Sequence, residues 1–380
     1  MKISLRLIKL QLSIFVISFF LSVVQAQAQA KKYVISSNDL ATVNSILRKH
    51  YVSNAKNLKY SNAVVASLSE GTIRKIKQEL PGAIIEEDYM AEIAGKPSAA
   101  GKPTPPSSGQ TVAWGITAIQ ARDAHLYNRG AGVRVCIVDT GVQFSHPDLL
   151  GQVVDGENFV ANRQGQVDPT KYDDDNGHGT HVAGIVAALD NNIGVVGVAP
   201  DAKLIAIKVL SSKGYGSTSL IAEGIRACIA KGADVINMSL GIVSDDASYV
   251  MLTAIQEAAS AGVVIVAAAG NVGGALITFP ARFSEVIAVT AIDSSYALAS
   301  FSSWGPEADF TAPGVGVYST FKSSRYTNYD GTSQAAPHVA GVIALSLSAG
   351  SLGPIGVDIG LTPEQQGLGL INALSTVVNF

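Results

Sequence analysis

After residue 110, short apolar runs alternate with longer stretches that have helical periodicity. The apolar runs are nearly continuous, which is typical of strands that are buried on both faces of a parallel sheet. Strands are predicted over Val133–Val138, Lys203–Val209, Val235–Met238, Val263–Ala268 and Val286–Ala291. Helices are predicted over His181–Leu189, Ser219–Lys231, Tyr249–Ala261 and Ser333–Leu347. This alternation predicts an α/β fold in which helices cover both faces of a mainly parallel sheet.

The first 109 residues divide into three segments of different composition. Residues 1–30 have a basic start, an apolar centre and a small-residue end, which predicts a secretory signal peptide; a membrane anchor is the alternative, for which the apolar run is short. Residues 31–94 predict a small α+β domain, with strands over Tyr33–Ser36, Ala63–Leu68 and Ala83–Glu86 and helices over Asp39–Tyr51 and Ser69–Leu80. Residues 95–109 predict a flexible linker, and residues 110–380 form the main domain.

Charge and cysteine content exclude several classes of protein. The net charge of −3 argues against non-specific nucleic-acid binding, and a hydrophobic content of 47% excludes a globally disordered chain. Cys136 lies in a predicted strand and Cys228 on a predicted helix. Two cysteines exclude a disulfide-dense scaffold, but they leave open whether these two pair or remain buried thiols.

Polar side chains lie at or near the ends of three predicted strands, namely Asp139, Ser239 and Asn271. The carboxyl ends of parallel strands meet at one edge of the sheet, where catalytic groups gather. Each residue also has a plain structural explanation: Asp139 can terminate its strand, and Asn271 can stabilise a turn. An amide at this position can equally donate to an oxyanion.

His178 lies just before one predicted helix, and Ser333 is the first residue of another. His178 and His181 could bind a metal ion, but the pattern lacks a third ligand and the spacing of zinc sites. The alternative makes His178 a general base and His181 a packing residue. Ser333 suits an N-cap and a nucleophile equally well. Pro337 is expected in the first turn, where its missing N–H removes no helical bond.

These four side chains together supply the roles of acyl transfer: an orienting carboxylate, a base, an oxyanion donor and a nucleophile, in Asp139, His178, Asn271 and Ser333. A lipase or esterase is excluded, because Ser333 lies outside a Gly-x-Ser-x-Gly frame and comes last in the chain order.

The motifs around these residues resemble those of subtilisin-family serine proteases, the subtilases. The matching segments are Val138-Asp139-Thr140-Gly141, Gly177-His178-Gly179-Thr180-His181-Val182-Ala183-Gly184, Val235-Ile236-Asn237-Met238-Ser239-Leu240-Gly241, Ala267–Asn271 and Gly331–Gly341. The resemblance runs from about Gln110 to the C-terminus. It implies a subtilisin-like three-layer α/β/α fold, preceded by a ferredoxin-like propeptide over 31–94 that acts as intramolecular inhibitor and chaperone. It also implies a secreted (or periplasmic) serine endopeptidase made as a self-processing zymogen, expected to be a monomer that acts on polypeptides.

The resemblance assigns a role to each catalytic residue. Ser333 is implied as the nucleophile, His178 as the base and Asp139 as its orienting partner, with Asn271 donating to the oxyanion. The implied substrate-binding residues are Ser239, Leu240, Gly241, Gly214, Gly216 and Thr278. Thr278 falls near the base of the S1 pocket, where many relatives have glycine, which favours medium apolar P1 residues.

A structural calcium site is also implied by the resemblance. Its ligands would be side-chain oxygens of Gln110, Asp148 and Asn191 and backbone carbonyls of Leu189, Ile193 and Val195. The acidic run Asp173-Asp174-Asp175 is interpreted as a solvated loop, with a further ion site as the alternative.

Several features depart from the family pattern or leave a choice open. The propeptide-like segment predicts a first cut near Ala94, well before Gln110, so that either the linker is retained or a second trimming follows. Gln334 replaces the methionine usual after the nucleophile, and the region after Leu347 is short. A dedicated processing protease and a catalytically silent binding protein remain as alternatives.

Overall fold

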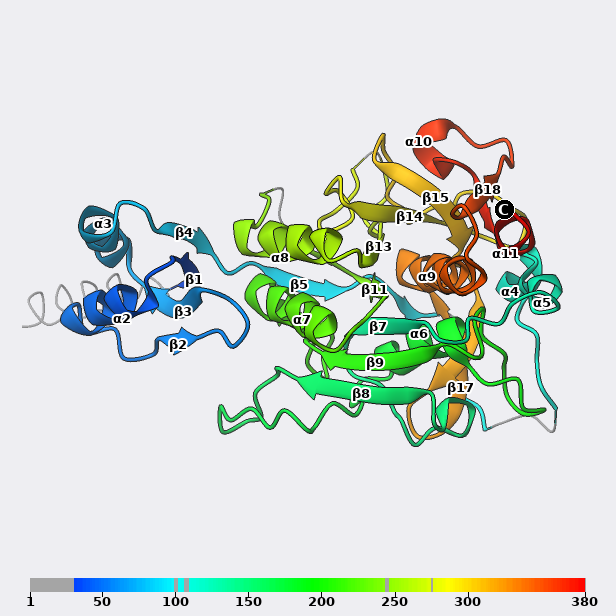
Figure 1. Cartoon of the computed structure of the whole chain (residues 1–380), viewed down its shortest axis with the longest axis horizontal. Helices are drawn as coiled ribbons and strands as arrows, with labels where there is room; N and C mark the ends of the chain where they lie inside the picture. The colour runs from blue at the N-terminus through cyan, green and yellow to red at the C-terminus, as the bar shows by residue number, and fades with distance from the viewer. Residues whose placement is uncertain (1–30, 99–101, 106–108, 243–245, 275, 380) are drawn as a thin grey trace, which may run out of the picture. The chain divides into compact units, whose positions relative to one another are not determined.

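The computed structural model describes residues 31–98, 102–105, 109–242, 246–274 and 276–379 (Figure 1). The predicted signal peptide, residues 1–30, lies outside the described residues. The described chain divides into two compact units. The first contains residues 31–58 and 62–88, and the second contains residues 59–61 and the chain from Tyr89 onward.

The first unit is an antiparallel sheet with two helices. Its elements are β1 (Lys31–Ser36), α2 (Leu40–Lys49), β2 (Lys56–Asn57), β3 (Ala63–Leu68), α3 (Glu70–Glu79) and β4 (Ile84–Glu87). The strand order β2-β3-β1-β4 is that of a ferredoxin-like fold, as predicted. Both helices begin after a capping side chain, since Asp39 accepts from the N–H of Thr42 and Ser69 from that of Thr72.

A large sheet forms the centre of the second unit. Among the described residues its strand order is β18-β19-β15-β14-β13-β11-β7-β9-β8. All neighbouring strands are parallel except β18 and β19. Their bounds are β7 (Arg134–Asp139), β8 (Val153–Asn158), β9 (Lys203–Lys208), β11 (Val235–Met238), β13 (Val264–Ala268), β14 (Val286–Ile292), β15 (Ala308–Pro313), β18 (Ile355–Val357) and β19 (Leu370–Asn372).

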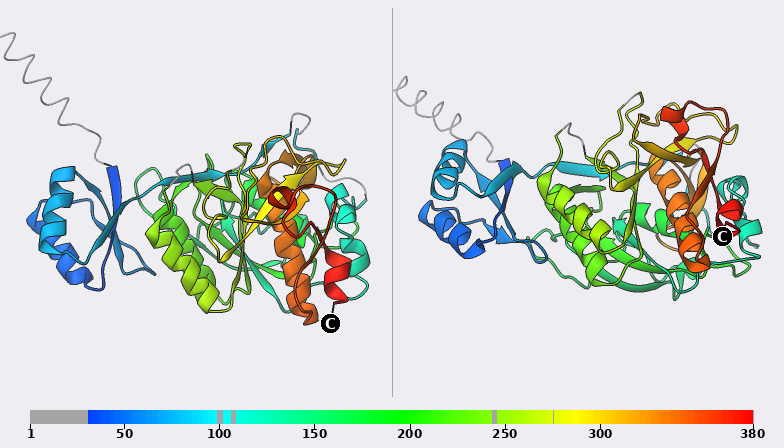
Figure 2. Two further views of the ribbon diagram at one scale, coloured as in Figure 1. Left: turned by 90° about the horizontal axis from the view of Figure 1, so that it is seen from above. Right: turned by 45° about the horizontal axis from the view of Figure 1, so that its top comes forward.

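Helices lie on both sides of this sheet, which gives three layers. The pair α7 (Thr218–Ala230) and α8 (Tyr249–Ser260) packs together against one side, and the pair α6 (His178–Ala187) and α9 (Thr332–Ala349) packs against the other. The short helix α11 (Ala373–Val377) lies beside α9 and α5 (Ala121–Ala124) (Figure 2). The remaining short helices are α4 (Trp114–Ala118), α10 (Pro363–Gln366) and the 3₁₀ turn η1 (Pro147–Leu149).

Two small sheets flank the carboxyl edge of the large one. In the first, β5 (Met90–Ile93) lies between β10 (Tyr215–Ser217) and β12 (Leu240–Ile242). In the second, β17 (Arg325–Asp330) lies between β16 (Val317–Phe321) and β6 (Lys96–Pro97). Both therefore include a short strand from the region around residue 94.

The predicted parallel strands are all present, with ends that differ by one residue at most. The helix predicted over His181–Leu189 begins earlier, at His178, because a buried carboxylate holds its first turn. The expectation for Pro337 is wrong. Helix α9 begins at Thr332, so that Pro337 is the sixth helical residue and removes one helical hydrogen bond.

The two cysteines, whose pairing was left open, form a disulfide. Cys136 on β7 and Cys228 on α7 have their sulfur atoms 2.06 Å apart, and 92 residues separate them in sequence. Both are fully buried. The bond therefore fastens one covering helix to the strand that ends at Asp139.

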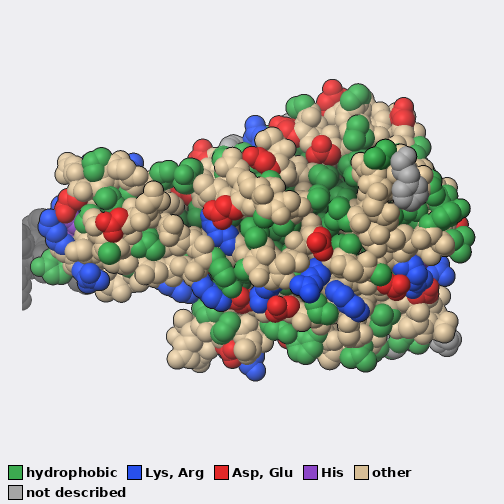
Figure 3. Space-filling view, viewed as in Figure 1, with side chains coloured by type: hydrophobic (Ala, Val, Ile, Leu, Met, Phe, Trp, Pro, Cys, Tyr) green, Lys and Arg blue, Asp and Glu red, His purple; other side chains and the backbone are tan. Residues whose placement is uncertain are grey.

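The surface mixes charges of both signs. On the face drawn in Figure 3, Lys and Arg side chains are interspersed with Asp and Glu, in keeping with the small net charge. Among the helices that the structure describes, none has the length and apolarity needed to cross a membrane.

Candidate active site

Asp139 and His178 form a buried pair at the carboxyl edge of the large sheet. Asp139 is the last residue of β7, and His178 is the first residue of α6. The Nδ1 atom of His178 lies 2.9 Å from both carboxylate oxygens of Asp139, and neither side chain is exposed. The Nε2 atom has no hydrogen-bond partner among the described residues. A carboxylate at Nδ1 fixes the ring and leaves Nε2 for proton transfer.

The start of α6 is held by the carboxylate of Asp174. This fully buried side chain accepts hydrogen bonds from the backbone N–H groups of Asn176, Gly177 and Thr180 and from the hydroxyl groups of Thr180 and Thr140, at 2.7–2.9 Å. Burial raises the pKa of this carboxyl group, and the hydrogen bonds from Thr180, Gly177 and Asn176 oppose that shift. The interpretation of residues 173–175 as a solvated loop is thus wrong for Asp174, although both neighbouring aspartates are exposed.

Ser333 is the second residue of α9 and contacts the substrate-binding candidate Ser239 twice. The hydroxyl of Ser333 donates to the carbonyl oxygen of Ser239 at 2.7 Å, and the hydroxyl of Ser239 donates to the carbonyl oxygen of Ser333 at 2.8 Å. Pro337 has no N–H to donate to that carbonyl, so the hydroxyl of Ser239 supplies it with a donor. In this arrangement the Ser333 hydroxyl faces Ser239, so it must turn to reach the free Nε2 of His178.

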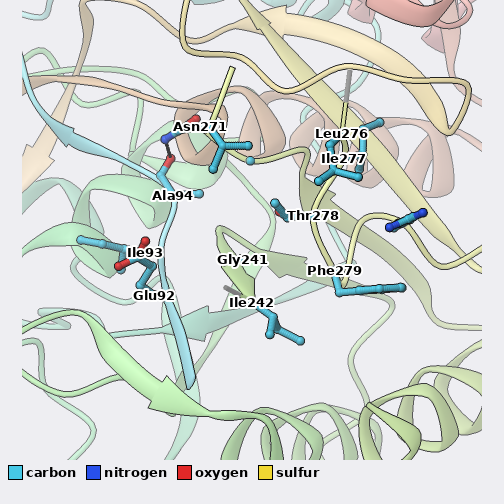
Figure 4. A pocket seen from close by; sticks show the side chains of 13 residues that line it. Glu92, Ile93, Ala94, Gly241, Ile242, Asn271, Leu276, Ile277, Thr278 and Phe279 are labelled. Carbon is cyan, nitrogen blue, oxygen red and sulfur yellow. Dashed lines mark hydrogen bonds between the residues drawn. The ribbon is translucent and has the colours of Figure 1, made fainter. Parts of the chain in front are cut away.

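Two donors converge on one backbone carbonyl, that of Ala94. The side-chain amide of Asn271, just after β13, donates to the Ala94 oxygen at 2.6 Å, and the N–H of Ser333 donates to it at 3.0 Å (Figure 4). The amide is oriented by Thr332, whose N–H and hydroxyl both lie 2.9 Å from its Oδ1. Such a pair of donors is the arrangement that stabilises an oxyanion.

The residues before Ala94 lie between two strands that were predicted to bind substrate. Strand β5 pairs with β10 and β12, so that Gly216 lies opposite Ala91 and both Gly241 and Tyr215 lie opposite Glu92. The N–H of Ile93 donates to Gly214, and that of Ala94 donates to Ser239. Leu240 pairs with Ile93. The five backbone positions proposed for substrate binding therefore surround one extended segment of the chain itself.

Gly95 follows at the point where His178 and Ser333 meet. A Cβ atom built on Gly95 would lie 3.1 Å from Nε2 of His178 and 3.2 Å from Cβ of Ser333. It would also lie 2.7 Å from Oε1 of Gln334, whose buried amide has no partner among the described residues. Only glycine fits here without a shift, and the Ala94–Gly95 peptide bond is the one presented to both side chains.

A cavity of about 370 Å³ opens beside Ala94. Thr278 is one of the residues that line it, and a Cβ atom on Gly241 or Gly270 would come within 2.9 Å of the threonine hydroxyl. The methyl group of Ala94 leaves most of the space empty. Several mainly apolar lining residues come from the loop after Asn271, namely Val272, Leu276, Ile277, Phe279 and Arg282, and the other lining residues that were not predicted include Glu92, Ile93, Ile242 and Gly270. Leu276, Ile277 and Phe279 are drawn in Figure 4.

The predicted calcium ligands lie in one cluster away from the serine. The amide nitrogen of Gln110 lies 2.8 Å from the carbonyl oxygen of Leu189 and 3.2 Å from that of Val195. The amide nitrogen of Asn191 lies 3.0 Å from the buried carboxylate of Asp148. Ile193 donates its N–H to Asn191. No group of three or more His, Cys, Asp or Glu suited to a metal is found among the described residues.

Two of the positioning residues were not predicted from the sequence. Asp174 was passed over because a run of three aspartates is usually solvated, although its position three residues before a positive-φ glycine at a helix start is a capping signal. Thr332 could not be singled out, because its contact with Asn271 depends on two segments 61 residues apart.

Comparisons with known proteins agree with this geometry. The subtilase family profile matches residues 130–373. The chain is 39% identical to subtilisin J of Geobacillus stearothermophilus over 349 residues, which covers 88% of this chain and 86% of the relative. It is 40% identical to subtilisin E of Bacillus subtilis, over 84% of this chain and 80% of the relative. It is 50% identical to subtilisin DY of Bacillus licheniformis over 63% of this chain and 85% of the relative.

Proposed function

The chain belongs to the subtilase family and is a serine endopeptidase, and from this premise we propose that it is a self-processing zymogen that first cuts its own Ala94–Gly95 bond. In this proposal Ser333 is the nucleophile, His178 the base, Asp139 its orienting partner and Asn271 the oxyanion donor. Residues 31–94 act as intramolecular inhibitor and chaperone, residues 95–109 are a linker, and residues 110–380 form the catalytic domain.

One observation carries the proposal: the carbonyl of Ala94 accepts hydrogen bonds from Asn271 and from the Ser333 N–H while the preceding residues are paired on both sides. A carbonyl held by both donors is polarised for attack, and the paired strands fix the peptide in register. Ala94 therefore takes the P1 position and Gly95 the position after the scissile bond.

The reaction follows from these contacts. The Ser333 hydroxyl turns from Ser239 toward Nε2 of His178, attacks the Ala94 carbonyl carbon and transfers its proton to Nε2. The tetrahedral oxyanion is held by Asn271 and the Ser333 N–H. His178 then returns the proton to the nitrogen of Gly95 as the peptide bond breaks, which leaves an acyl-enzyme. Water adds by the same steps in reverse and frees the Ala94 carboxylate and Ser333.

For other substrates we propose a preference for medium apolar P1 residues. The cavity beside Ala94 is walled by apolar side chains, and Thr278 lines it close to Gly241 and Gly270. A peptide library profiled with the processed enzyme tests this assignment. A preference for large aromatic P1 residues in the wild type, unchanged in Thr278→Gly, would contradict it.

A structural calcium ion fits the cluster around Asp148. Its carboxylate is fully buried, burial raises its pKa, and the donors around it are neutral: Asn191, the N–H of Val195 and the hydroxyl of Tyr326. Rotating the amides of Gln110 and Asn191 by 180° would turn two further oxygens toward the carbonyls of Leu189 and Val195 and toward Asp148. An all-oxygen set of this kind suits Ca²⁺. The ion would fasten residue 110 to the loop 189–195 and would take no part in the chemical steps.

The calcium assignment is tested by thermal unfolding of a Ser333→Ala variant with added Ca²⁺ or with a chelator. We expect the chelator to lower the midpoint, and we expect Asp148→Ala to abolish the difference. Equal midpoints with Ca²⁺ and chelator in the Asp148-containing protein would contradict the site.

We further propose that the protein is exported, on the basis of the signal-like pattern of residues 1–30. The decisive experiment expresses the wild type beside Ser333→Ala and follows mass, N-terminal sequence and fluorophosphonate labelling. The wild type should give a fragment that begins at Gly95 and should be labelled, whereas Ser333→Ala should stay uncut and unlabelled. A folded wild type that stays uncut would refute self-processing.

A further inference from the structure

The chain continues beyond the scissile bond along the edge of β17. Lys96 lies opposite Asp330 and Pro97 opposite Tyr329 in an antiparallel pair. The N–H of Ser98 donates to the carbonyl of Asn328 at 3.0 Å, and the Ser98 hydroxyl donates to the carboxylate of Asp330. The leaving-group side of the site is thus occupied by a backbone ladder, just as the other side is occupied by β5.

A second set of bonds holds the same edge further along. The N–H of Thr104 donates to the carbonyl of Tyr326 at 2.8 Å, and the N–H of Tyr326 donates to the carbonyl of Thr104 at 3.0 Å. The Thr104 hydroxyl also lies 3.2 Å from that of Tyr318. Thr104 lies on the C-terminal side of the Ala94–Gly95 bond, so cleavage of that bond breaks none of these hydrogen bonds.

The segment is also anchored at its downstream end. The N–H of Thr111 donates to the carbonyl of Gly194 at 2.6 Å, and the side chain of Gln110 bonds to Leu189. After the cut, the strand that begins at Gly95 would remain attached to the catalytic domain by a tether of a few residues. Short tethers give effective concentrations of the order of millimolar, so backbone pairing that is weak between separate molecules persists within one.

Because β17 leads directly into Gly331 and the nucleophile, its register relative to Ser333 is fixed. A polypeptide substrate that follows the path of this chain beyond its scissile bond would use the same N–H and C=O groups of Asn328 to Asp330. The strand 95–98 and a long substrate therefore compete for one edge. A short substrate with no residues after its scissile bond does not need that edge.

We propose that the strand that begins at Gly95 stays paired with the edge of β17 in cis after the first cut, through Lys96–Ser98 and through Thr104. These residues then inhibit the cleavage of long polypeptides until a second cleavage removes them. This inference rests on the proposed self-processing at Ala94–Gly95. It accounts for the gap between that bond and Gln110, since the linker reaches from the nucleophile to the loop 189–195.

The retained strand also has a chemical consequence. While it stays paired, the new amine of Gly95 remains next to the acyl-enzyme. This amine can attack the ester carbonyl of Ala94 while Nε2 of His178 takes one of its protons, and His178 then passes that proton to the serine oxygen as the ester bond breaks and the peptide bond re-forms. Water must therefore compete with this tethered amine for the acyl-enzyme. Hydrolysis of the acyl-enzyme is slowed until the strand dissociates from β17.

The test uses the protein after the first cut, whose chain begins at Gly95 (the Gly95 form). It compares the wild type with the double variant Ser98→Pro/Thr104→Pro, which lacks two N–H donors to β17. Ser98→Ala/Thr104→Ala keeps both N–H groups and is the matched control. Each form is freed of its N-terminal fragment, checked by mass, and assayed on two substrates. One is a short peptide p-nitroanilide, and the other is an internally quenched peptide with several residues beyond its scissile bond.

We expect the proline variant to cleave the long peptide about ten-fold faster in kcat/KM than the wild type, mainly through a lower KM, because two backbone hydrogen bonds no longer favour the competing strand. The p-nitroanilide should be cleaved equally by all three, and the alanine control should behave as the wild type. Equal rates on the long peptide in all three forms would overturn this inference alone. Loss of p-nitroanilide hydrolysis in all three would refute the proposed function and this inference with it.

Discussion

Replacing Asp174 by asparagine should disable the enzyme although the residue touches neither substrate nor nucleophile. All five groups that contact this carboxylate are hydrogen-bond donors. The asparagine amide has the same shape but carries an NH₂ group, which would face some of these donors instead of accepting from them. If the amide nitrogen replaces Oδ2, the N–H of Thr180 loses its acceptor. If it replaces Oδ1, the N–H groups of Asn176 and Gly177 both lose theirs. The threonine hydroxyls can turn, but the backbone N–H groups cannot.

The smaller of these two losses sets the expected magnitude. One buried N–H without a partner costs about 1–3 kcal/mol, and the amide hydrogens that face it add to the penalty. The first turn of α6 would move to relieve the clash, and with it the ring of His178. A misplacement of a catalytic group by about 1 Å can lower the rate by about 100-fold. We therefore expect kcat to fall by about 10- to 100-fold while KM changes little.

The assay measures kcat and KM on a short p-nitroanilide together with urea unfolding in a Ser333→Ala background. Asp173→Asn is the matched control, because it removes the same charge from the neighbouring, exposed residue. It should leave kcat and the unfolding midpoint nearly unchanged. If Asp174→Asn retained the kcat and the stability of the wild type, Asp174 would not be the group that positions α6.

Three further predictions follow from single contacts. Asn271→Ala should lower kcat by about 10²–10³-fold at similar KM, a range known from subtilisin itself, and a loss that appears only in KM would speak against its role at the oxyanion. In the Ser333→Ala background, replacing Cys136 and Cys228 by alanine should lower the free energy of unfolding by about 4–5 kcal/mol, because the disulfide closes a loop of 92 residues. Urea unfolding measures this change, and a loss below about 1 kcal/mol would count against the disulfide. Burial lowers the pKa of His338 to about 4, so between pH 6.5 and 4 the unfolded chain binds a proton that the folded chain does not. His338 should therefore contribute a fall in stability of about 1.4 kcal/mol per pH unit as the pH drops through this range, to which His181 adds its own contribution. The slope for His338→Gln should be smaller by that amount, and an unchanged slope would show that His338 does not contribute.

The sequence was informative wherever local pattern and chemistry coincide. Asp139 and Asn271 could be placed because each follows an apolar strand, and parallel strands bring such residues to one edge. His178 and Ser333 could be placed because each begins a helix after a glycine-containing turn. The predicted ends of the parallel strands differ little from the structure, because in buried strands the hydrophobic run and the hydrogen-bonded run coincide.

The remaining parts depend on contacts between segments far apart in the chain. Nothing in the composition of residues 95–109 predicts that Lys96–Pro97 forms a strand, since its pairing depends on the free edge of β17 rather than on its own propensity. The disulfide could not be decided either, because it requires that α7 cross β7 at the level of Cys136. Asp174 was misjudged because its partners are three backbone N–H groups and two threonine hydroxyls, which leave no trace in a charge pattern.

Pro337 shows how a locally unfavourable residue can serve the site. Proline inside a helix removes one hydrogen bond, a cost that would argue against it on propensity alone. The carbonyl freed by that loss belongs to Ser333, and the hydroxyl of Ser239 takes it. Ser239 also offers its own carbonyl to the Ser333 hydroxyl and to the N–H of Ala94. The helix interruption therefore joins the nucleophile's backbone to the strand that aligns the substrate. In the proposed reaction, the residue that pairs with P1 therefore also contacts the hydroxyl and the backbone of the nucleophile.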